Sequence, residues 1–169
     1  MIVIRQLASA DPRLMRELVA LLTDSVHGGA SVGFLAPLAP ATAERYWAGV
    51  FAALGPGHSL FVAEQGERVV GSVQIDFCQK DNGRHRAEVQ KLFVLTGYRG
   101  QGIASQLMHA LEAHAKERRL TLLVLDTHAG SHAENVYRHH GWQRVGEIPD
   151  YAGIPSGELI ATALYFKKL

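Results

Sequence analysis

The feature that most constrains the fold is a glycine-rich segment, Arg99-Gly100-Gln101-Gly102, that lies between two structural patterns. An apolar run typical of a strand ends just before it, and a helical repeat of apolar residues begins just after it. A second apolar run, Leu120 to Asp126, follows that helix and is typical of a buried strand. A strand, a helix and a strand in this order favour a parallel pair joined by a right-handed crossover. Glycines at the helix start let a ligand approach the backbone, and unpaired N–H groups there attract an anion.

The rest of the chain predicts further helices and strands around this unit. A strand over residues 2–5 precedes a helix that Asp11 caps and Pro12 starts. Residues Ser131 to Glu134 have the pattern of a capping box and predict the start of a short helix that ends near Gly141. The other expected elements are a helix over 41–54, strands over 60–63, 69–77, 86–95 and 120–126, a helix over 103–119, and strands over 142–148 and 159–167. We expect one mixed α/β domain over residues 1–169.

The strand over 86–95 changes the parity of its apolar positions. Ala87 and Val89 are odd-numbered, whereas Leu92 and Val94 are even-numbered. Because strand side chains alternate between faces, this change indicates either a β-bulge near Gln90-Lys91 or a strand buried on both faces. The pattern alone does not separate the two.

Charge and composition exclude several classes of function. The formal net charge is +1, so bulk electrostatics gives no support for a nucleic-acid or membrane partner. The first residues contain no long apolar run, which predicts a cytoplasmic protein without a signal peptide or a membrane span. The single cysteine, Cys78, excludes an internal disulfide, and its apolar neighbours favour a buried thiol over a nucleophile. A monomer and a homodimer both remain open.

Three interpretations of the glycine segment compete. No GxxxxGK[ST] motif occurs, so a P-loop is excluded. A dinucleotide-binding fingerprint is incomplete, because Gly100 and Gly102 fit but Ser105 occupies the third glycine position. That fingerprint also usually opens its domain, whereas more than half of this chain precedes the segment. A turn that binds nothing and a site for a pyrophosphate-bearing acyl carrier are the interpretations that remain.

The acyl-carrier interpretation is supported by a resemblance to the GNAT superfamily of N-acetyltransferases. Their acetyl-CoA motif, Arg/Gln-x-x-Gly-x-Gly/Ala, is matched by Arg99, Gly102 and Ala104. The order of predicted elements is also similar, so the resemblance covers the whole chain and implies a twisted mixed sheet of about six to seven strands with helices on both faces. Five blocks are further similar to the tabtoxin-resistance acetyltransferases, a GNAT branch that inactivates a β-lactam toxin: HGGASVGF (27–34), RAEVQKLFVL (86–95), LDTHAGSHAENVY (125–137), RVGEIPDY (144–151) and TALYFKKL (162–169).

Acetyl transfer to an amine needs a base for the ammonium, a donor to the developing oxyanion and a proton for the thiolate that leaves. Glu88 and Asp126 are the candidate carboxylates, because on neighbouring parallel strands both would face one cleft, where one pKa would rise. The resemblance implies the roles of base and proton handler for these two residues. It also aligns Tyr137 with the tyrosine that protonates the CoA thiolate in many members. Each residue also has an alternative role. Glu88 could be an ordinary acid on the strand surface, Asp126 a cap for the loop that follows it, and Tyr137 an aromatic that packs the short helix on the sheet.

The residues expected to bind the acetyl donor follow from the helix start and from the resemblance. The amides from Gln101 to Ala104 are the expected donors to the pyrophosphate. The resemblance adds the main chain of the preceding strand, and Ser131 as a substitute for an asparagine that many members carry where this chain has Gly130. The full set is Leu92, Phe93, Val94, Arg99, Gly100, Gln101, Gly102, Ile103, Ala104 and Ser131.

The acceptor is expected to bind at the glycine-rich segment after the first long helix, with one aromatic residue from a later segment at the same mouth. The candidate contacts are His27, Gly28, Gly29, Ser31, Phe34 and Tyr151. His128 and His132 have i, i+4 spacing, but no HExxH motif or third ligand accompanies them, so no metal site is predicted.

The sequence therefore predicts an acetyl-CoA-dependent N-acetyltransferase for small amine-bearing molecules. The resemblance suggests a toxin or antibiotic of the tabtoxinine-β-lactam type as one acceptor, and acetyl-CoA as the donor. The alternatives are a non-catalytic CoA-binding sensor and an acetyltransferase for protein N-termini or lysines. Whether Glu88 or Asp126 is the base, and whether an amine or a hydroxyl is acetylated, stay open.

Overall fold

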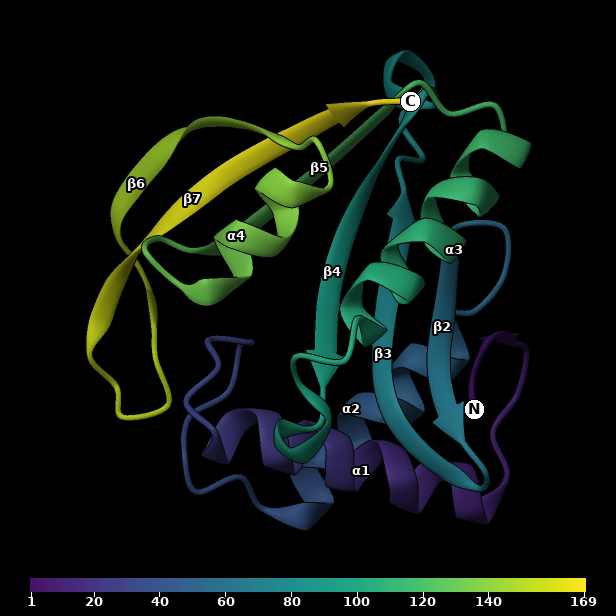
Figure 1. Ribbon diagram of the computed structural model, residues 1–169, viewed down its shortest axis with the longest axis vertical. Helices are drawn as coiled ribbons and strands as arrows, with labels where there is room; N and C mark the ends of the chain where they lie inside the picture. The colour runs from purple at the N-terminus through teal and green to yellow at the C-terminus, as the bar shows by residue number, and fades with distance from the viewer.

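The computed structural model describes all 169 residues and contains one seven-stranded sheet. Its strand order is β1-β2-β3-β4-β5-β7-β6, and β4 and β5 form the one parallel pair (Figure 1). The strands are β1 (Ile2–Leu7), β2 (His58–Gln65), β3 (Arg68–Phe77), β4 (Arg86–Val94), β5 (Leu122–His128), β6 (Gln143–Gly153) and β7 (Leu159–Lys168). The helices are α1 (Pro12–His27), α2 (Pro40–Ala53), α3 (Ile103–Glu117) and α4 (His132–His139). The mixed α/β fold predicted from the sequence is confirmed.

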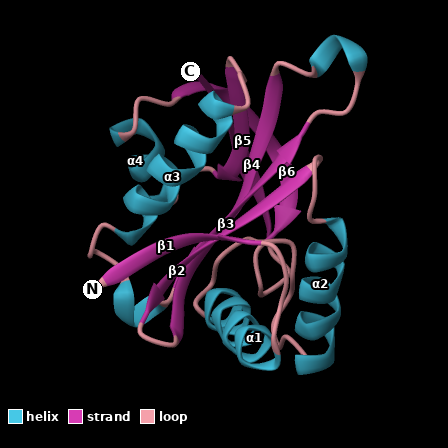
Figure 2. Ribbon diagram, turned by 90° about the vertical axis from the view of Figure 1, so that its right-hand side faces the viewer, coloured by secondary structure: helices cyan, strands magenta, loops and turns pink.

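The helices form layers on opposite faces of the sheet, with α1 and α2 on one face and α3 and α4 on the other (Figure 2). α1 begins where the sequence predicts, because the Asp11 carboxylate accepts a hydrogen bond of 2.7 Å from the Leu14 N–H. Each long helix buries one apolar stripe against the sheet: Leu14, Leu18, Leu21 and Leu22 in α1, and Ile103, Leu107, Met108 and Leu111 in α3. None of the four helices is long and apolar enough to span a bilayer.

The sheet splits where its parallel strands separate. β4 and β5 pair only at Arg86–Leu122, Ala87–Leu123 and Glu88–Val124. Beyond Glu88, the edge of β4 that faces β5 has no strand partner. The fold therefore opens in the middle of the sheet, with backbone groups on one wall of the opening.

A β-bulge in β4 lies at the start of this opening. β3 pairs Gln74 with Gln90 and Ser72 with Phe93, so Lys91 and Leu92 together face the single residue Val73. Lys91 has φ 56°, which is rare outside glycine. The bulge that the parity change indicates is confirmed, and the alternative of a strand buried on both faces is wrong.

β6 departs from the predicted boundary. The sequence predicts a strand that ends at residue 148, whereas β6 continues to Gly153. Its pairing with β7 shifts between Ile148 and Ala152, and Asp150 there has φ 50°. A bulged strand breaks the alternating pattern on which the prediction depends, which explains the missed residues.

Candidate active site

The loop between β4 and α3 presents a row of free backbone N–H groups. Gly100 and Gly102 have φ of 76° and 74°, a region that favours glycine. From Gly100 to Ser105, no backbone N–H donates to another group of the protein. Because α3 begins at Ile103, these amides also lie at the positive end of its dipole. The loop has the geometry of a phosphate-binding site.

The same loop is fastened to the end of α1. The Thr96 N–H and hydroxyl donate to Asp24 Oδ2 at 2.8 and 3.0 Å. Arg99 Nε donates to the Val94 carbonyl at 3.3 Å, and its Nη2 lies 3.6 Å from where a Cβ on Gly28 would stand. Arg99 therefore braces the loop against α1 while its side chain stays exposed beside the free amides.

Glu88 lies on the face of the sheet that α1 and α2 cover. It is two residues before Gln90, and alternate residues of a strand share a face. Gln90 pairs with Gln74 of β3, whose side-chain amide donates to the Tyr46 hydroxyl of α2 at 2.9 Å. The Glu88 carboxyl is thus directed to the same side as α2, at the point where β4 and β5 separate.

Asp126 lies beside Glu88 on this face. Val124 is the β5 partner of Glu88, and Asp126 follows it by two residues, so the two carboxyl groups share one side of the opening. The Thr162 hydroxyl of β7 lies 3.1 Å from Asp126 Oδ2 and fixes its orientation. The structure therefore brings together the two carboxylates that the sequence analysis selects.

The surroundings of Glu88 favour a basic carboxylate. Burial raises the pKa of Glu88, the carboxylates of Asp126 and Asp76 raise it further, and the Lys91 ammonium partly offsets them. The direction agrees with the prediction, although burial contributes more than the carboxylate pair. A carboxylate with a raised pKa is better matched to accept a proton near neutral pH.

Lys91 is a candidate that the sequence analysis missed. It is half-buried on the bulge, and burial lowers the pKa of its ammonium while Asp126 and Glu88 oppose that change. A Cβ on Gly33 would stand 3.4 Å from Lys91 Nζ, so the connection between α1 and α2 passes over it. The parity change marked the bulge but carried no signal about where this side chain points.

Tyr137 approaches from α4, on the other face of the sheet. Its ring lies 6.0 Å from the rings of Trp142 and Tyr165, and only 7% of its surface is exposed. Burial raises the pKa of Tyr137 and the charge of Asp126 adds to this, so its hydroxyl stays protonated in the neutral range. Both proposed roles, packing and proton donation, are compatible with this position.

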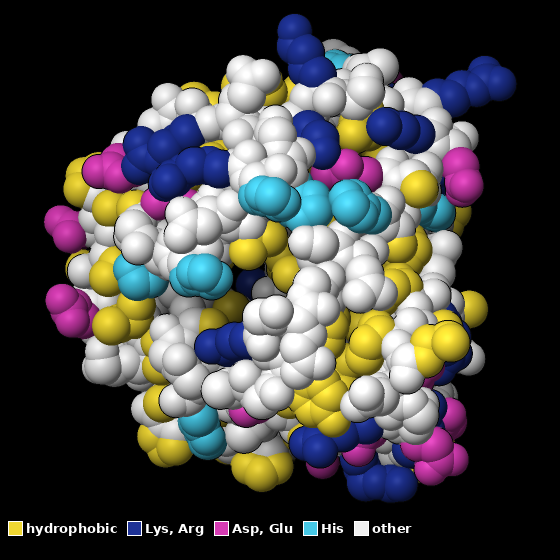
Figure 3. Space-filling view, viewed as in Figure 1, with side chains coloured by type: hydrophobic (Ala, Val, Ile, Leu, Met, Phe, Trp, Pro, Cys, Tyr) yellow, Lys and Arg dark blue, Asp and Glu magenta, His cyan; other side chains and the backbone are white.

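The wall of the opening is the unpaired edge of β4 from Leu92 to Val94. Phe93 is buried and packs on Trp47 of α2 with their ring centroids 6.4 Å apart, so its side chain fixes the strand while its main chain faces the gap. Figure 3 shows the surface hollowed beside β4 and α4. These residues can contribute backbone groups to a ligand, as the resemblance implies.

Two distant segments meet at the mouth where the acceptor is expected. The Ser31 hydroxyl donates to the Gly153 carbonyl at 3.4 Å, and the Ala36 N–H donates to the Pro155 carbonyl at 2.9 Å. The connection between α1 and α2 is thereby joined to the end of the β6–β7 hairpin. Tyr151, which is 55% exposed, lies two residues before Gly153 in β6.

The other predicted acceptor contacts have structural partners. His27 Nε2 accepts from the Leu38 N–H at 3.3 Å and so closes the connection on itself. Phe34 packs edge-on against Tyr46, with ring centroids 5.3 Å apart. Gly28 and Gly29 follow α1 directly, and φ of Gly29 is 86°. Phe34 therefore connects the mouth to α2, whereas His27 shapes the loop.

Ser131 does not form the predicted capping box. Its buried hydroxyl has no hydrogen-bond partner, and the Glu134 carboxylate accepts instead from the Gly130 N–H at 2.6 Å. Glu134 is 2% exposed and also accepts from Tyr165, Arg138 and Arg144. The capping-box prediction is wrong because these distant partners, which the local pattern cannot show, compete for the carboxylate.

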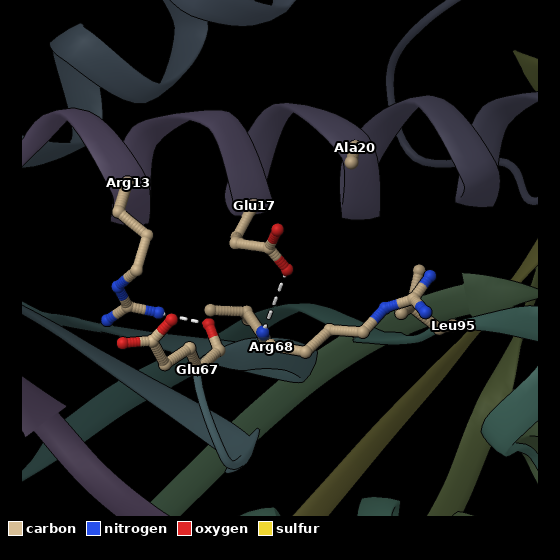
Figure 4. A pocket seen from close by; sticks show the side chains of 7 residues that line it. Arg13, Glu17, Ala20, Glu67, Arg68 and Leu95 are labelled. Atoms are coloured by element: carbon tan, nitrogen blue, oxygen red, sulfur yellow. Dashed lines mark hydrogen bonds between the residues drawn. The ribbon is translucent and has the colours of Figure 1, made fainter.

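Two cavities lie along α1. One of about 330 Å³ is lined by Arg13, Glu17 and Arg68 among others (Figure 4). There Arg13 donates to the Glu67 carbonyl and Glu17 accepts from the Val69 N–H at 3.2 Å. These polar groups fasten α1 to the β2–β3 turn, so the cavity carries no sign of chemistry. The other, of about 660 Å³, runs along α1 to Thr96 and is lined by His27 and Gly28, two of the predicted acceptor contacts.

Comparison with a family model identifies the protein family. The model described as the acetyltransferase (GNAT) family matches residues 16–142, which include β4, the glycine loop, α3, β5 and α4. The chain belongs to the GNAT acetyltransferase family. The GNAT resemblance of the sequence is thus confirmed, and the protein is an acyltransferase.

Individual relatives agree with this assignment. An uncharacterized N-acetyltransferase from the hisH–hisA intergenic region of Azospirillum brasilense is 32% identical over 114 residues, 66% of this chain and 67% of the relative. N-acetyltransferase 8B of Rattus norvegicus is 33% identical over 93 residues, 54% of this chain, and the match spans 42% of the length of the rat protein.

Solved GNAT structures share the whole fold. An N-acetyltransferase from Staphylococcus aureus Mu50 superposes with a TM-score of 0.80 at 19% identity, covering 99% of this chain and 98% of the other. A ribosomal-protein-alanine N-acetyltransferase from Brucella melitensis gives a TM-score of 0.79 at 22% identity, covering 99% of each chain. At these identities the likeness concerns the fold.

GNAT enzymes generally transfer an acetyl group from acetyl-CoA to an amine-bearing acceptor. The described residues fit such a donor, because the free amides from Gly100 to Ser105 offer an uncompensated anion site. The unpaired edge of β4 runs from the carboxylates to that loop.

Proposed function

We propose that the protein is a cytoplasmic acetyl-CoA-dependent N-acetyltransferase for small, polar, amine-bearing molecules, with residues 1–169 acting as one domain. The observation that supports this most is the arrangement around the split between β4 and β5. Glu88 and Asp126 lie where the strands separate, and free loop amides lie where β4 ends. A base and an anion site joined by an unpaired strand edge match the needs of acetyl transfer from a CoA thioester.

The donor would be held mainly by main-chain groups. The amides from Gln101 to Ala104, with Gly100 and Arg99 beside them, would bind the diphosphate. The backbone from Leu92 to Val94 would bind the pantetheine arm and donate to the thioester oxygen. Ser131 fits a supporting contact, since its hydroxyl has no partner within the protein.

The acceptor nitrogen would attack the donor directly. Glu88, assisted by Asp126, removes a proton from the ammonium, and the freed nitrogen forms a bond to the thioester carbonyl carbon. The tetrahedral intermediate then collapses: the C–S bond breaks, and the thiolate takes the proton of the Tyr137 hydroxyl. The nitrogen releases its second proton to solvent, from which Tyr137 is protonated again. No acyl-enzyme is needed. The sole cysteine, Cys78, lies after β3 beside Arg86, at the far end of β4 from the loop.

Small polar amines are proposed because two segments joined by polar contacts meet at the mouth. Ser31 and Tyr151 come from the two segments that meet there, and Phe34 of the α1–α2 connection packs beside them on Tyr46 of α2. We include β-lactam amino acids of the tabtoxinine type among the acceptors on the basis of the five similar sequence blocks. A detoxifying or resistance role would follow from such an acceptor.

A thiol-release assay with acetyl-CoA and a panel of amines, including β-lactam amino acids, tests this proposal. The variants Glu88→Gln and Asp126→Asn should lower kcat/KM by roughly 10²–10⁴-fold. Calorimetry should show unchanged binding of CoA, because neither side chain touches the loop. Asp81→Asn, at a carboxylate that is 94% exposed outside the opening, is the matched control.

Three results would contradict the proposal. CoA binding without turnover of any amine would indicate a sensor, and ping-pong kinetics with acetylated Cys78 would indicate an acyl-enzyme. Acetylation restricted to peptide N-termini or lysine side chains would move the acceptor to proteins.

A further inference from the structure

Lys91 is an ammonium group at the opening that the mechanism does not use. It lies on the bulge of β4, next to the position where β4 leaves β5. Its side chain is half-buried, and no carboxylate oxygen lies within 4.0 Å of Nζ. By contrast, the half-buried Lys167 binds Glu112 at 2.7 Å. A partly buried cation without a partner is costly unless a ligand supplies the counter-charge.

The groups that face Lys91 come from three parts of the fold. Glu88 of β4 and Asp126 of β5 act on it electrostatically, and Gly33 of the α1–α2 connection lies over Nζ. Gly33 has φ 92° and no side chain, so the backbone approaches the lysine closely. This connection is the segment that contains the proposed acceptor contacts. The ammonium therefore lies on the acceptor side of the opening, beside the connection between α1 and α2.

The charge of the acceptor changes when the base removes its proton. Once the base has taken the proton of the acceptor amine, the attacking nitrogen is neutral. A carboxylate elsewhere on the acceptor would then remain uncompensated beside Glu88 and Asp126. We propose that Lys91 binds a carboxylate of the acceptor, so that the preferred substrates are amino acids and similar amines that carry an acid group. This inference rests on the proposed function and specifies its substrate class.

Paired acceptors that differ only in the carboxylate test this directly. We would compare L-lysine with cadaverine, and L-methionine with L-methioninamide, in the thiol-release assay. In the unsubstituted protein, the member with a carboxylate should have the higher kcat/KM by roughly 10- to 100-fold, mainly through KM. Lys91→Asn should reduce this preference to near one, and Lys91→Arg should retain most of it.

The substitutions of Lys91 must suit the positive φ of the bulge. Asparagine tolerates positive φ better than most residues, so Lys91→Asn should preserve the fold, which thermal unfolding would check. Lys80→Asn, at an exposed lysine outside the opening, is the matched control. Because each comparison is a ratio between two acceptors, a general loss of activity cancels.

Two other outcomes would overturn the inference. Lys91→Asn could shift the pH profile of kcat/KM and leave the carboxylate preference unchanged, which would mean that Lys91 only tunes Glu88. The unsubstituted protein could also prefer the acceptors without a carboxylate. If the unsubstituted protein acetylates no amine at all, the proposed function fails together with the inference. Turnover without a preference for a carboxylate contradicts the inference alone.

Discussion

The two sides of the opening are built in different ways. On the donor side, the free amides come from one continuous segment, Gly100 to Ser105, and their direction is set by two glycines and a helix start. On the acceptor side, Ser31 and Gly153 meet although 122 residues separate them in the chain. The donor side depends on local backbone conformation, whereas the acceptor side depends on how remote loops pack. This difference suggests that donor and acceptor affinity can be changed separately.

The largest expected effect concerns Glu134, which joins α4 to the strands of the acceptor side. Burial opposes its ionisation, but hydrogen bonds from Tyr165, Gly130, Arg138 and Arg144 outweigh it and lower the pKa of Glu134 to about 2. A lowered carboxyl pKa stabilises the fold above the ordinary value of 4.5 and loses that effect as the pH falls toward 2. The contribution is roughly 3 kcal/mol.

Urea unfolding between pH 7 and pH 3 measures this contribution. The free energy of unfolding of Glu134→Gln should be lower at pH 7 and should fall less steeply with acid than that of the unsubstituted protein. Glu44→Gln, at an exposed position of α2, should behave like the unsubstituted protein. Identical acid slopes for all three would show that the Glu134 network stabilises nothing.

The next effect concerns Tyr137 of α4, the proposed proton donor to the thiolate. Tyr137→Phe removes only the hydroxyl, so kcat should fall by roughly 100-fold while the KM values for donor and acceptor stay the same. The unfolding midpoint should not change, because the hydroxyl has no hydrogen bond to another side chain and the ring keeps its packing. Unchanged kcat would assign Tyr137 to packing alone.

A smaller, one-sided effect is expected at the glycine loop. Gly102→Ala places a side chain at φ 74°, which should tilt the free amides and raise the KM for acetyl-CoA roughly tenfold. The KM for the acceptor should not move. Gly97→Ala is the control, because a Cβ there meets nothing within 4 Å and its φ is not positive. Equal changes in both KM values would break the separation between the two sides.

The smallest effect tests the acceptor side. Ser31→Ala removes a long hydrogen bond of 3.4 Å to the Gly153 carbonyl, so the acceptor KM should rise only about threefold. Steady-state kinetics with varied acetyl-CoA should give an unchanged donor KM. A change confined to the donor KM would show that this contact supports the loop rather than the mouth.

The contrast between local conformation and long-range packing also explains which features could be predicted from the sequence. The bulge in β4 was one of two alternatives that the sequence offered, because a change of face leaves a local trace in Ala87, Val89, Leu92 and Val94. The free loop amides were predicted because Gly100 and Gly102 precede a helix start. Glu88 and Asp126 share a face because the strand–helix–strand pattern predicts a parallel pair.

The missed features depend on tertiary contacts. The direction of the Lys91 side chain follows from a φ of 56° that the pattern does not specify. The partners of Glu134 come from β6, β7 and α4, so its local neighbours suggested a capping box instead. The extra residues of β6 follow from a register shift near Asp150, which no alternating pattern predicts.

The split of the sheet after Glu88 has a consequence for inhibition. Because β4 and β5 pair over only three residues and then separate, the two sides border one gap. A single molecule in which an acceptor amine is linked through a short acyl bridge to the sulfur of CoA would fill both sides at once. Such a bisubstrate compound should bind roughly 10²–10⁴-fold more tightly than CoA, since its second contact forms at a high effective concentration.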